Sequence, residues 1–244
     1  MKKTTSIIAM IVVFALIGVS AARAQQTSQQ PETKTFVSIS AGGQFGSQTF
    51  SSSTSFPLYG ETATAATNQA VGGGFVFDAS GAYRVWRNLA VGIGIWTFNG
   101  SGTAAGVASI PDPLQTGHPI TINATASDLK QTDVGVNFQA VWIQPVTDKI
   151  DVAFFGGPTL IHVSQDVATM TIASNAQTAT MTTSSQSGTT GKAGNVGVDA
   201  SYKLTERYRA GVFIRYAGGS INLPIVGDLT VGGAQLGGGV RIRF

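Results

Sequence analysis

The chain has 244 residues, of which only 11% are charged, against roughly 25% in soluble domains. Its formal charge is +3, but the predicted signal peptide contains three bases and no acid, which leaves 12 bases and 12 acids in the rest. This balance excludes a globally basic, nucleic-acid-binding protein. The absence of cysteine excludes a disulfide-held fold.

The N-terminus has the three parts of a secretory signal peptide. Lys2 and Lys3 precede an apolar run of 13 residues, 7–19, and Ala22-Arg23-Ala24 forms an A-x-A cleavage site. A retained anchor is the alternative, but a membrane-spanning helix needs about 20 apolar residues. We therefore predict a signal peptide at 1–24, cleaved after Ala24, a polar leader at 25–34, and one exported domain at 35–244.

The apolar residues of this domain recur with a period of two. Within 208–217, Tyr208, Val212 and Ile214 share one parity, whereas Arg209 and Arg215 share the other. A β-strand separates these two sets on opposite faces, but a helix would mix them. Eight segments show such alternation: 37–42, 75–85, 89–96, 133–142, 150–155, 195–204, 208–217 and 235–244.

The connections between these segments alternate in length. Those at 87–88, 145–149 and 205–206 are short, and those at 51–69, 104–120 and 170–190 are long and rich in small polar residues. This asymmetry is typical of an outer-membrane barrel, and a soluble β-sandwich is the disfavoured alternative. We predict an all-β fold: an eight-stranded antiparallel transmembrane β-barrel with short periplasmic turns and longer extracellular loops.

Aromatic residues gather near the short turns and the C-terminus, as expected for a girdle at a membrane interface. The predicted girdle consists of Tyr83, Trp142, Tyr202 and Tyr208, with Phe244 at the same level.

The last residues, Gly-Gly-Val-Arg-Ile-Arg-Phe, end in Phe244 after apolar residues at alternate positions. This ending resembles the C-terminal signature of bacterial outer-membrane proteins. Together with the signal and eight strands, it makes 35–244 similar to the small outer-membrane β-barrel superfamily that includes OmpA, OmpX and Ail-like proteins. The resemblance implies a Gram-negative outer membrane as location, outer-membrane lipid and lipopolysaccharide as surroundings, and recognition of Phe244 by the assembly machinery.

The polar parity of the strands is expected to face the lumen, because charges facing lipid cost roughly 2–4 kcal/mol near the midplane. An eight-stranded barrel is narrow enough for side chains to fill, which favours a plugged network over a narrow ion or solute channel. The predicted lumen charges are Asp78, Arg84, Asp133, Asp151, Asp199, Lys203, Arg209, Arg215, Arg241 and Arg243.

The segment 168–192 holds twelve Ser or Thr residues and one charge, Lys192. Its alternation predicts a hairpin that extends two strands beyond the membrane, with a disordered loop as the alternative. The Pro- and Gly-containing segment 110–120 resembles the tip of a second hairpin. Loops on a rigid scaffold are the usual place for a surface ligand.

One short motif suggests catalysis. His162-Val163-Ser164 resembles the His-x-Ser of outer-membrane lipid A deacylases, but Gln165 replaces the Asn of that family and no Glu appears before Glu206. With two distant His and no Cys, we expect no metal site and no cofactor. We predict a non-enzymatic envelope or surface-interaction protein; the alternatives are a narrow channel and, more remotely, a lipid A-modifying hydrolase.

Overall fold

The computed structural model describes residues 34–115, 117–172, 179–188, 191–223 and 227–244. The chain divides into two units, Met1–Thr33 and Lys34–Phe244, and the described residues all belong to the second. The predicted signal peptide and all but the last residue of the leader lie outside the described residues, so both stay predictions. No helix among the described residues is long and apolar enough to cross a membrane.

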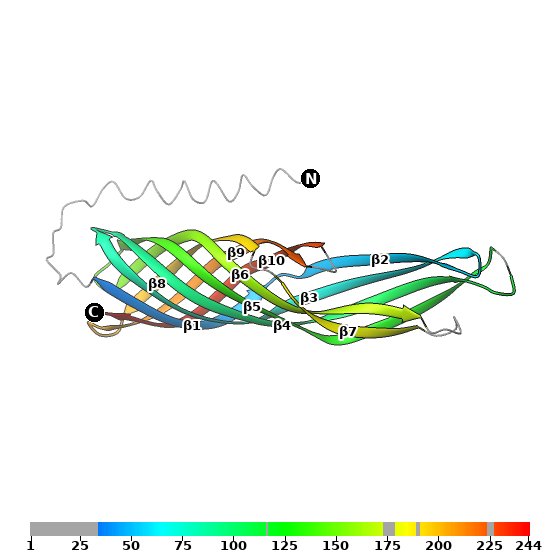
Figure 1. Cartoon of the computed structure of the whole chain (residues 1–244). Helices are drawn as coiled ribbons and strands as arrows, with labels where there is room; N and C mark the ends of the chain where they lie inside the picture. The colour runs from blue at the N-terminus through cyan, green and yellow to red at the C-terminus, as the bar shows by residue number, and fades with distance from the viewer. Residues whose placement is uncertain (1–33, 116, 173–178, 189–190, 224–226) are drawn as a thin grey trace, which may run out of the picture. The chain divides into compact units, whose positions relative to one another are not determined.

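The second unit is built entirely from antiparallel β-strands (Figure 1). They are β1 (Thr35–Phe45), β2 (Gln48–Leu58), β3 (Glu61–Trp86), β4 (Leu89–Pro111), β5 (Pro119–Pro145), β6 (Ile150–Ile172), β7 (Ala179–Ser187), β8 (Gly191–Lys203), β9 (Tyr208–Leu223) and β10 (Gly227–Arg243).

Eight of these strands close into a barrel. β1 pairs with β10 on one side and with β3 on the other, and the order β3-β4-β5-β6-β8-β9-β10 completes the ring. β2 and β7 are outer continuations: β3 pairs with both β1 and β2, and β6 pairs with both β7 and β8. Gly46, at φ +118°, interrupts the first of these long strands. The prediction of an eight-stranded barrel is therefore confirmed, although ten segments compose it.

Short turns join the strands at one end, as predicted. β3 and β4 are linked by Arg87 and Asn88 alone, and 146–149 and 204–207 connect β5 to β6 and β8 to β9. The barrel seam closes at this end, because the Phe244 amide donates to the Thr35 carbonyl at 3.0 Å and the Lys34 amide donates to the Phe244 carbonyl at 3.1 Å.

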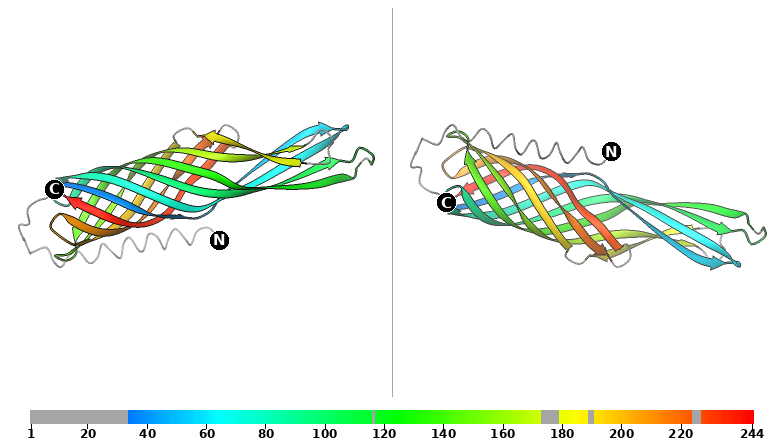
Figure 2. Two further views of the ribbon diagram at one scale, coloured as in Figure 1. Left: turned by 90° about the horizontal axis from the view of Figure 1, so that it is seen from below. Right: turned by 90° about the horizontal axis from the view of Figure 1, so that it is seen from above.

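Three hairpins project from the opposite end (Figure 2). The predicted hairpin within 168–192 is present where β6 pairs with β7, from Ser164–Ser187 to Ile172–Ala179, and its tip at 173–178 lies outside the described residues. The predicted tip at 110–120 closes the β4–β5 hairpin. The segment 51–69, expected as a loop, instead forms the β2–β3 hairpin around a two-residue turn, in which Tyr59 and Gly60 have φ of 51° and 78°.

The exterior of the barrel is apolar over the predicted face. Ile214 is 58% exposed, whereas its neighbour Arg215 is 3% exposed and points into the lumen. Aromatic side chains form two exposed belts. The belt at the turn end consists of Tyr83, Trp86, Trp142, Tyr202, Tyr208 and Phe244; the belt toward the hairpins contains Phe45, Phe75 and Tyr216. The predicted girdle contained every member of the turn-end belt except Trp86.

Candidate functional site

The half of the lumen nearest the turns holds a set of buried ion pairs. Asp151 on β6 accepts from Arg209 Nη1 on β9 and from Arg243 Nη2 on β10, both at 2.6 Å. One carboxylate therefore ties together two strands that are distant from it in sequence. Charge-assisted bonds of this kind are stronger than neutral ones, because the donor and the acceptor are both ionised.

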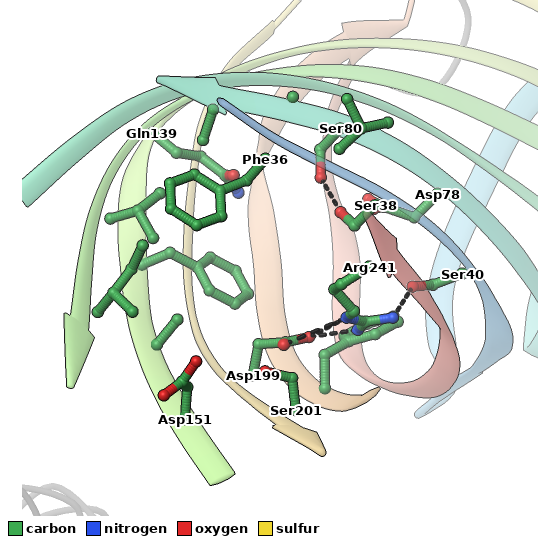
Figure 3. Close-up of a pocket in the computed structure, with 18 of the residues that line it drawn as sticks. Phe36, Ser38, Ser40, Asp78, Ser80, Gln139, Asp151, Asp199, Ser201 and Arg241 are labelled. Carbon is green, nitrogen blue, oxygen red and sulfur yellow. Dashed lines mark hydrogen bonds and ion pairs between the residues drawn. The ribbon is translucent and has the colours of Figure 1, made fainter. Parts of the chain in front are cut away.

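A second pair lies one layer further in (Figure 3). Arg241 contacts the Asp199 carboxylate through Nε and Nη2, and its Nη1 donates to Ser40 Oγ at 2.9 Å. Gly211 makes room for this arginine, since a Cβ there would lie 2.5 Å from Arg241 Nε. At this position a glycine of the inward parity therefore makes room for a long arginine side chain.

Arg215 forms the innermost pair. Its Nη1 donates to Asp78 Oδ2 at 2.7 Å, and its Nε donates to Gln235 Oε1 at 2.8 Å. The guanidinium also lies over the rings of Trp96 and Phe213, with centroid distances of 5.7 and 5.3 Å. Arg215 therefore joins the ion pairs below it to an apolar layer above.

Two predicted members do not take part in these ion pairs across the lumen. Asp133 is fully buried, but among the described residues its carboxylate accepts only from Gln131 Nε2, at 2.9 and 3.1 Å. Lys203 Nζ lies 2.7 Å from Glu206 Oε1, three residues along the same turn. The alternation of the strands predicted that these side chains face the lumen. Whether an opposite charge lies close enough to pair depends on the level of each residue along the barrel axis.

Arg84 makes a cation–π contact. Its guanidinium stacks on the ring of Phe36 at 5.2 Å from the centroid, and Arg243 stacks on the same ring at 5.0 Å. Phe36 thus contacts two cations at the turn end of the lumen.

A neutral network that the sequence analysis missed lies beside the ion pairs. Asn137 Oδ1 accepts from Trp96 Nε1 at 3.2 Å and from Thr159 Oγ1 at 2.8 Å. Asn195 Nδ2 donates to Thr159 Oγ1 at 2.8 Å, and Asn195 Oδ1 accepts from Gln139 Nε2 at 2.9 Å. The sequence signal that could have revealed this network is the position of these polar residues at alternate, lumen-facing sites of their strands.

Above the ion pairs, the lumen is filled by apolar side chains, which we call the apolar plug. Its members come from β3, β4, β6, β9 and β10, so it spans the barrel. They are Val76, Trp96, Phe98, Ile161, Val163, Ala217, Ile221, Leu229 and Val231. The predicted lumen was polar throughout and did not include this layer, although these apolar residues occupy the inward parity.

A cavity of about 120 Å³ remains between the ion pairs, at the turn end of the lumen (Figure 3). Ser38, Ser80, Asp199 and Arg241 line it, and Ser38 Oγ lies 2.6 Å from Ser80 Oγ. The acids that line it, Asp78, Asp151 and Asp199, each have an arginine partner. The cavity therefore offers neutral polar groups and no unpaired carboxylate.

The projecting hairpins have buried apolar cores of their own. Ala65, Ala108 and Ile110 form one core, against which Ile122 and Met170 pack. A second core contains Ala104, Leu129 and Ala168, with Met181 of β7 packed against it. The sheet of β2, β3, β4 and β5 therefore packs face to face on the β6–β7 hairpin. We call this assembly the projecting sandwich.

The suspected catalytic motif lies on the outer face of β6. His162 is exposed and Ser164 is partly exposed, and no hydrogen bond between their side chains occurs in the described part of the chain. Asp166 Oδ2 accepts from the Lys130 amide at 3.1 Å. The described residues contain no cluster of three or more His, Cys, Asp or Glu that could hold a metal ion.

A closed eight-stranded barrel with an apolar exterior, two aromatic belts and charges paired inside defines a small outer-membrane β-barrel protein. Neisserial surface protein A is similar over 86% of this chain and 97% of its own, with 16% identity and a TM-score of 0.46. The outer-membrane protease OmpT from Escherichia coli shows 9% identity over 90% and 99%, with a TM-score of 0.45. Ail of Yersinia pestis shows 12% identity over 85% and 99%, with a TM-score of 0.34.

No protein-family model matches the chain, and no curated protein matches it in sequence. The three solved structures are a surface protein, a protease and an attachment invasion locus protein, and none of these similarities assigns an activity to this chain.

Proposed function

We propose that this protein is a non-conducting, non-enzymatic outer-membrane barrel that presents the projecting sandwich for contacts at the cell surface. The observation that carries this proposal is the pair of buried cores inside the hairpins. Loops without a core would be ordered only on binding, at an entropic cost, whereas a packed sandwich offers a fixed surface.

The composition of the sandwich supports this role. Residues 48–58, 62–70, 101–111, 119–127, 167–172 and 179–187 contain no charged residue. Charges occur only at tips and bases, at Glu61, Asp112, Asp128, Lys130 and Asp166. The surface therefore suits partners recognised by backbone and hydroxyl hydrogen bonds rather than by charge.

The apolar plug supports the absence of conduction. Its side chains come from five strands and are buried above Arg215, so ions entering from the turn end would meet a largely apolar layer there. Discrete openings of the refolded mature chain in a planar bilayer would refute this part of the proposal. We expect none.

Two contacts follow from the resemblance rather than from the geometry. We propose that the apolar exterior contacts outer-membrane lipid and lipopolysaccharide, and that the assembly machinery recognises the strand ending at Phe244. We also propose that His162 and Ser164 are rim residues without catalysis. An assay of lipid A acyl chains, with Ser164→Ala as the control, should show no acyl loss for either form.

The surface role is tested by shortening the three hairpins to tight turns at the barrel rim. The shortened chain should still migrate as a folded barrel in a heat-modifiability gel, because the barrel ladder stays complete. Outer-membrane vesicles that carry it should bind less to immobilised fibronectin, collagen or neutral glycans, or to one another. Unchanged binding in every one of these assays would refute the proposal.

A further inference from the structure

The strand β2 lies at an edge of the projecting sandwich. Over its full length, from Gln48 to Leu58, it pairs with β3, and no other strand of the described residues pairs with it. Its base is fixed, because the Gln48 side-chain amide donates to the Gly232 carbonyl at 2.8 Å. One edge of β2 therefore presents backbone N–H and C=O groups without a strand partner.

This edge lacks the features that normally prevent edge pairing. Natural edge strands are blunted by Lys, by Pro, by bulges or by a covering segment. The sequence of β2, QTFSSSTSFPL, contains no charge, and its only proline is Pro57 at the tip. Its register with β3 is continuous through eleven pairs, without a bulge. The edge is free of bulges, uncharged and supported by three further strands.

We infer that β2 pairs with β2 of a second copy of this protein that is anchored in an opposing membrane. This inference rests on the proposed surface function and names its partner. The edge carries no charge, so two copies do not repel one another.

Direction decides which membrane the second copy occupies. β2 continues β1 away from the barrel, so every copy in one membrane has β2 running outward (Figure 1). Two such edges would meet parallel, and in a parallel ladder the facing residues are offset, so that two identical edges cannot be equivalent. Copies in opposed membranes meet antiparallel, which lets one two-fold axis relate them.

An eleven-residue edge buries little surface, so a single pair is weak. Many copies on two membranes act together, however, and avidity can exceed the affinity of one pair by about 10²–10⁴. The expected consequence is clustering of membranes that both carry the protein, and no clustering when only one membrane carries it.

The test uses the refolded mature chain in neutral phosphatidylcholine vesicles, with two fluorescent labels and clustering read by energy transfer. Ser53→Lys/Ser55→Lys places like charges on both paired edges and should lower clustering by about tenfold. Ser53→Glu/Ser55→Glu should do the same. Mixing the Lys vesicles with the Glu vesicles should restore clustering, because opposite charges then face each other.

Thr180→Lys/Thr182→Lys on β7 is the matched control, since β7 is a second uncharged strand that pairs only with β6 among the described residues. It should leave clustering unchanged. Loss of clustering with the β7 variant alone, or no recovery in the Lys–Glu mixture, would overturn the assignment to β2. Absence of clustering, with binding to fibronectin, collagen or glycans still lost on shortening the hairpins, would refute this inference and leave the proposed function standing.

A cysteine crosslink separates opposing membranes from a shared one. The chain has no cysteine, so Ser53→Cys can form disulfides only between copies. Two epitope tags, one per vesicle population, should be recovered together in the oxidised dimer. Dimers that form only within one population would refute pairing across membranes.

Discussion

The ion pair between Arg215 and Asp78 allows a quantitative test of the lumen. Arg215→Ala removes a donor 2.7 Å from Asp78 Oδ2 and a second donor 2.8 Å from Gln235 Oε1, at a site where Arg215 is 3% exposed. Removal of one partner of a buried pair leaves the other charge uncompensated, which costs about 3–5 kcal/mol. We expect the free energy of unfolding to fall by that amount.

The combined variant Asp78→Leu/Arg215→Met separates the unpaired charge from lost packing. It removes both charges and leaves only the Gln235 carbonyl without its donor, at a cost of about 1–3 kcal/mol. It should therefore be more stable than Arg215→Ala. Arg207→Ala, exposed in the β8–β9 turn, is the surface control and should stay within about 0.5 kcal/mol of the parent.

These free energies can be measured by reversible urea unfolding in lipid vesicles, followed by tryptophan fluorescence. A loss below about 1 kcal/mol for Arg215→Ala would refute the reasoning. Asp78 lines the cavity of about 120 Å³, so such a result would mean that water there solvates the carboxylate as well as the arginine does.

Three further predictions concern the barrel wall and its seam. Val212 faces lipid midway between the two aromatic belts, so Val212→Arg should cost about 2–4 kcal/mol in the same urea assay, and a loss under about 1 kcal/mol would invert the facing assignments. Gly135→Ala would place a Cβ 2.3 Å from the Trp96 ring and should cost about 1–3 kcal/mol, whereas Gly81→Ala meets nothing closer than 3.8 Å and should be neutral in thermal unfolding. Phe244→Ala keeps the backbone bonds of the seam, so it should lower outer-membrane yield in cells while refolding in detergent stays intact; equal losses in both assays would contradict a role in recognition.

The sequence by itself determined the fold class because a transmembrane barrel obeys strict local rules. Every strand must alternate, since lipid surrounds one face and the filled lumen the other. Ile214 and Arg215 therefore showed their opposite directions without any tertiary information. Short turns also mark one end of a barrel unambiguously, because two-residue connections such as 87–88 permit only an antiparallel hairpin.

The partners of the lumen charges were decided only by the tertiary structure. Parity predicts whether a side chain faces the lumen or the lipid, but not its level along the barrel axis. That level depends on the register between strands that are far apart in sequence. Asp78 and Arg215 lie 137 positions apart and form an ion pair, whereas Asp133 shares their parity but, within the described part of the chain, is hydrogen-bonded to Gln131 alone. The apolar plug could not be predicted for the same reason. Trp96 and Val163 come from separate strands, which only the closure of the ring brings to one level.

The projecting sandwich lies between these two cases. Alternation of Thr, Ser and Ala indicated that 168–192 continues a hairpin, since such alternation is independent of what the strand packs against. The packing of Met170 and Ala168 on the sheet of β2 to β5 could not be predicted, because small side chains such as Ala104 and Ala108 give no hydrophobic signal strong enough to define a core. Their burial follows from the ring, which holds the hairpins close enough to exclude water from between them.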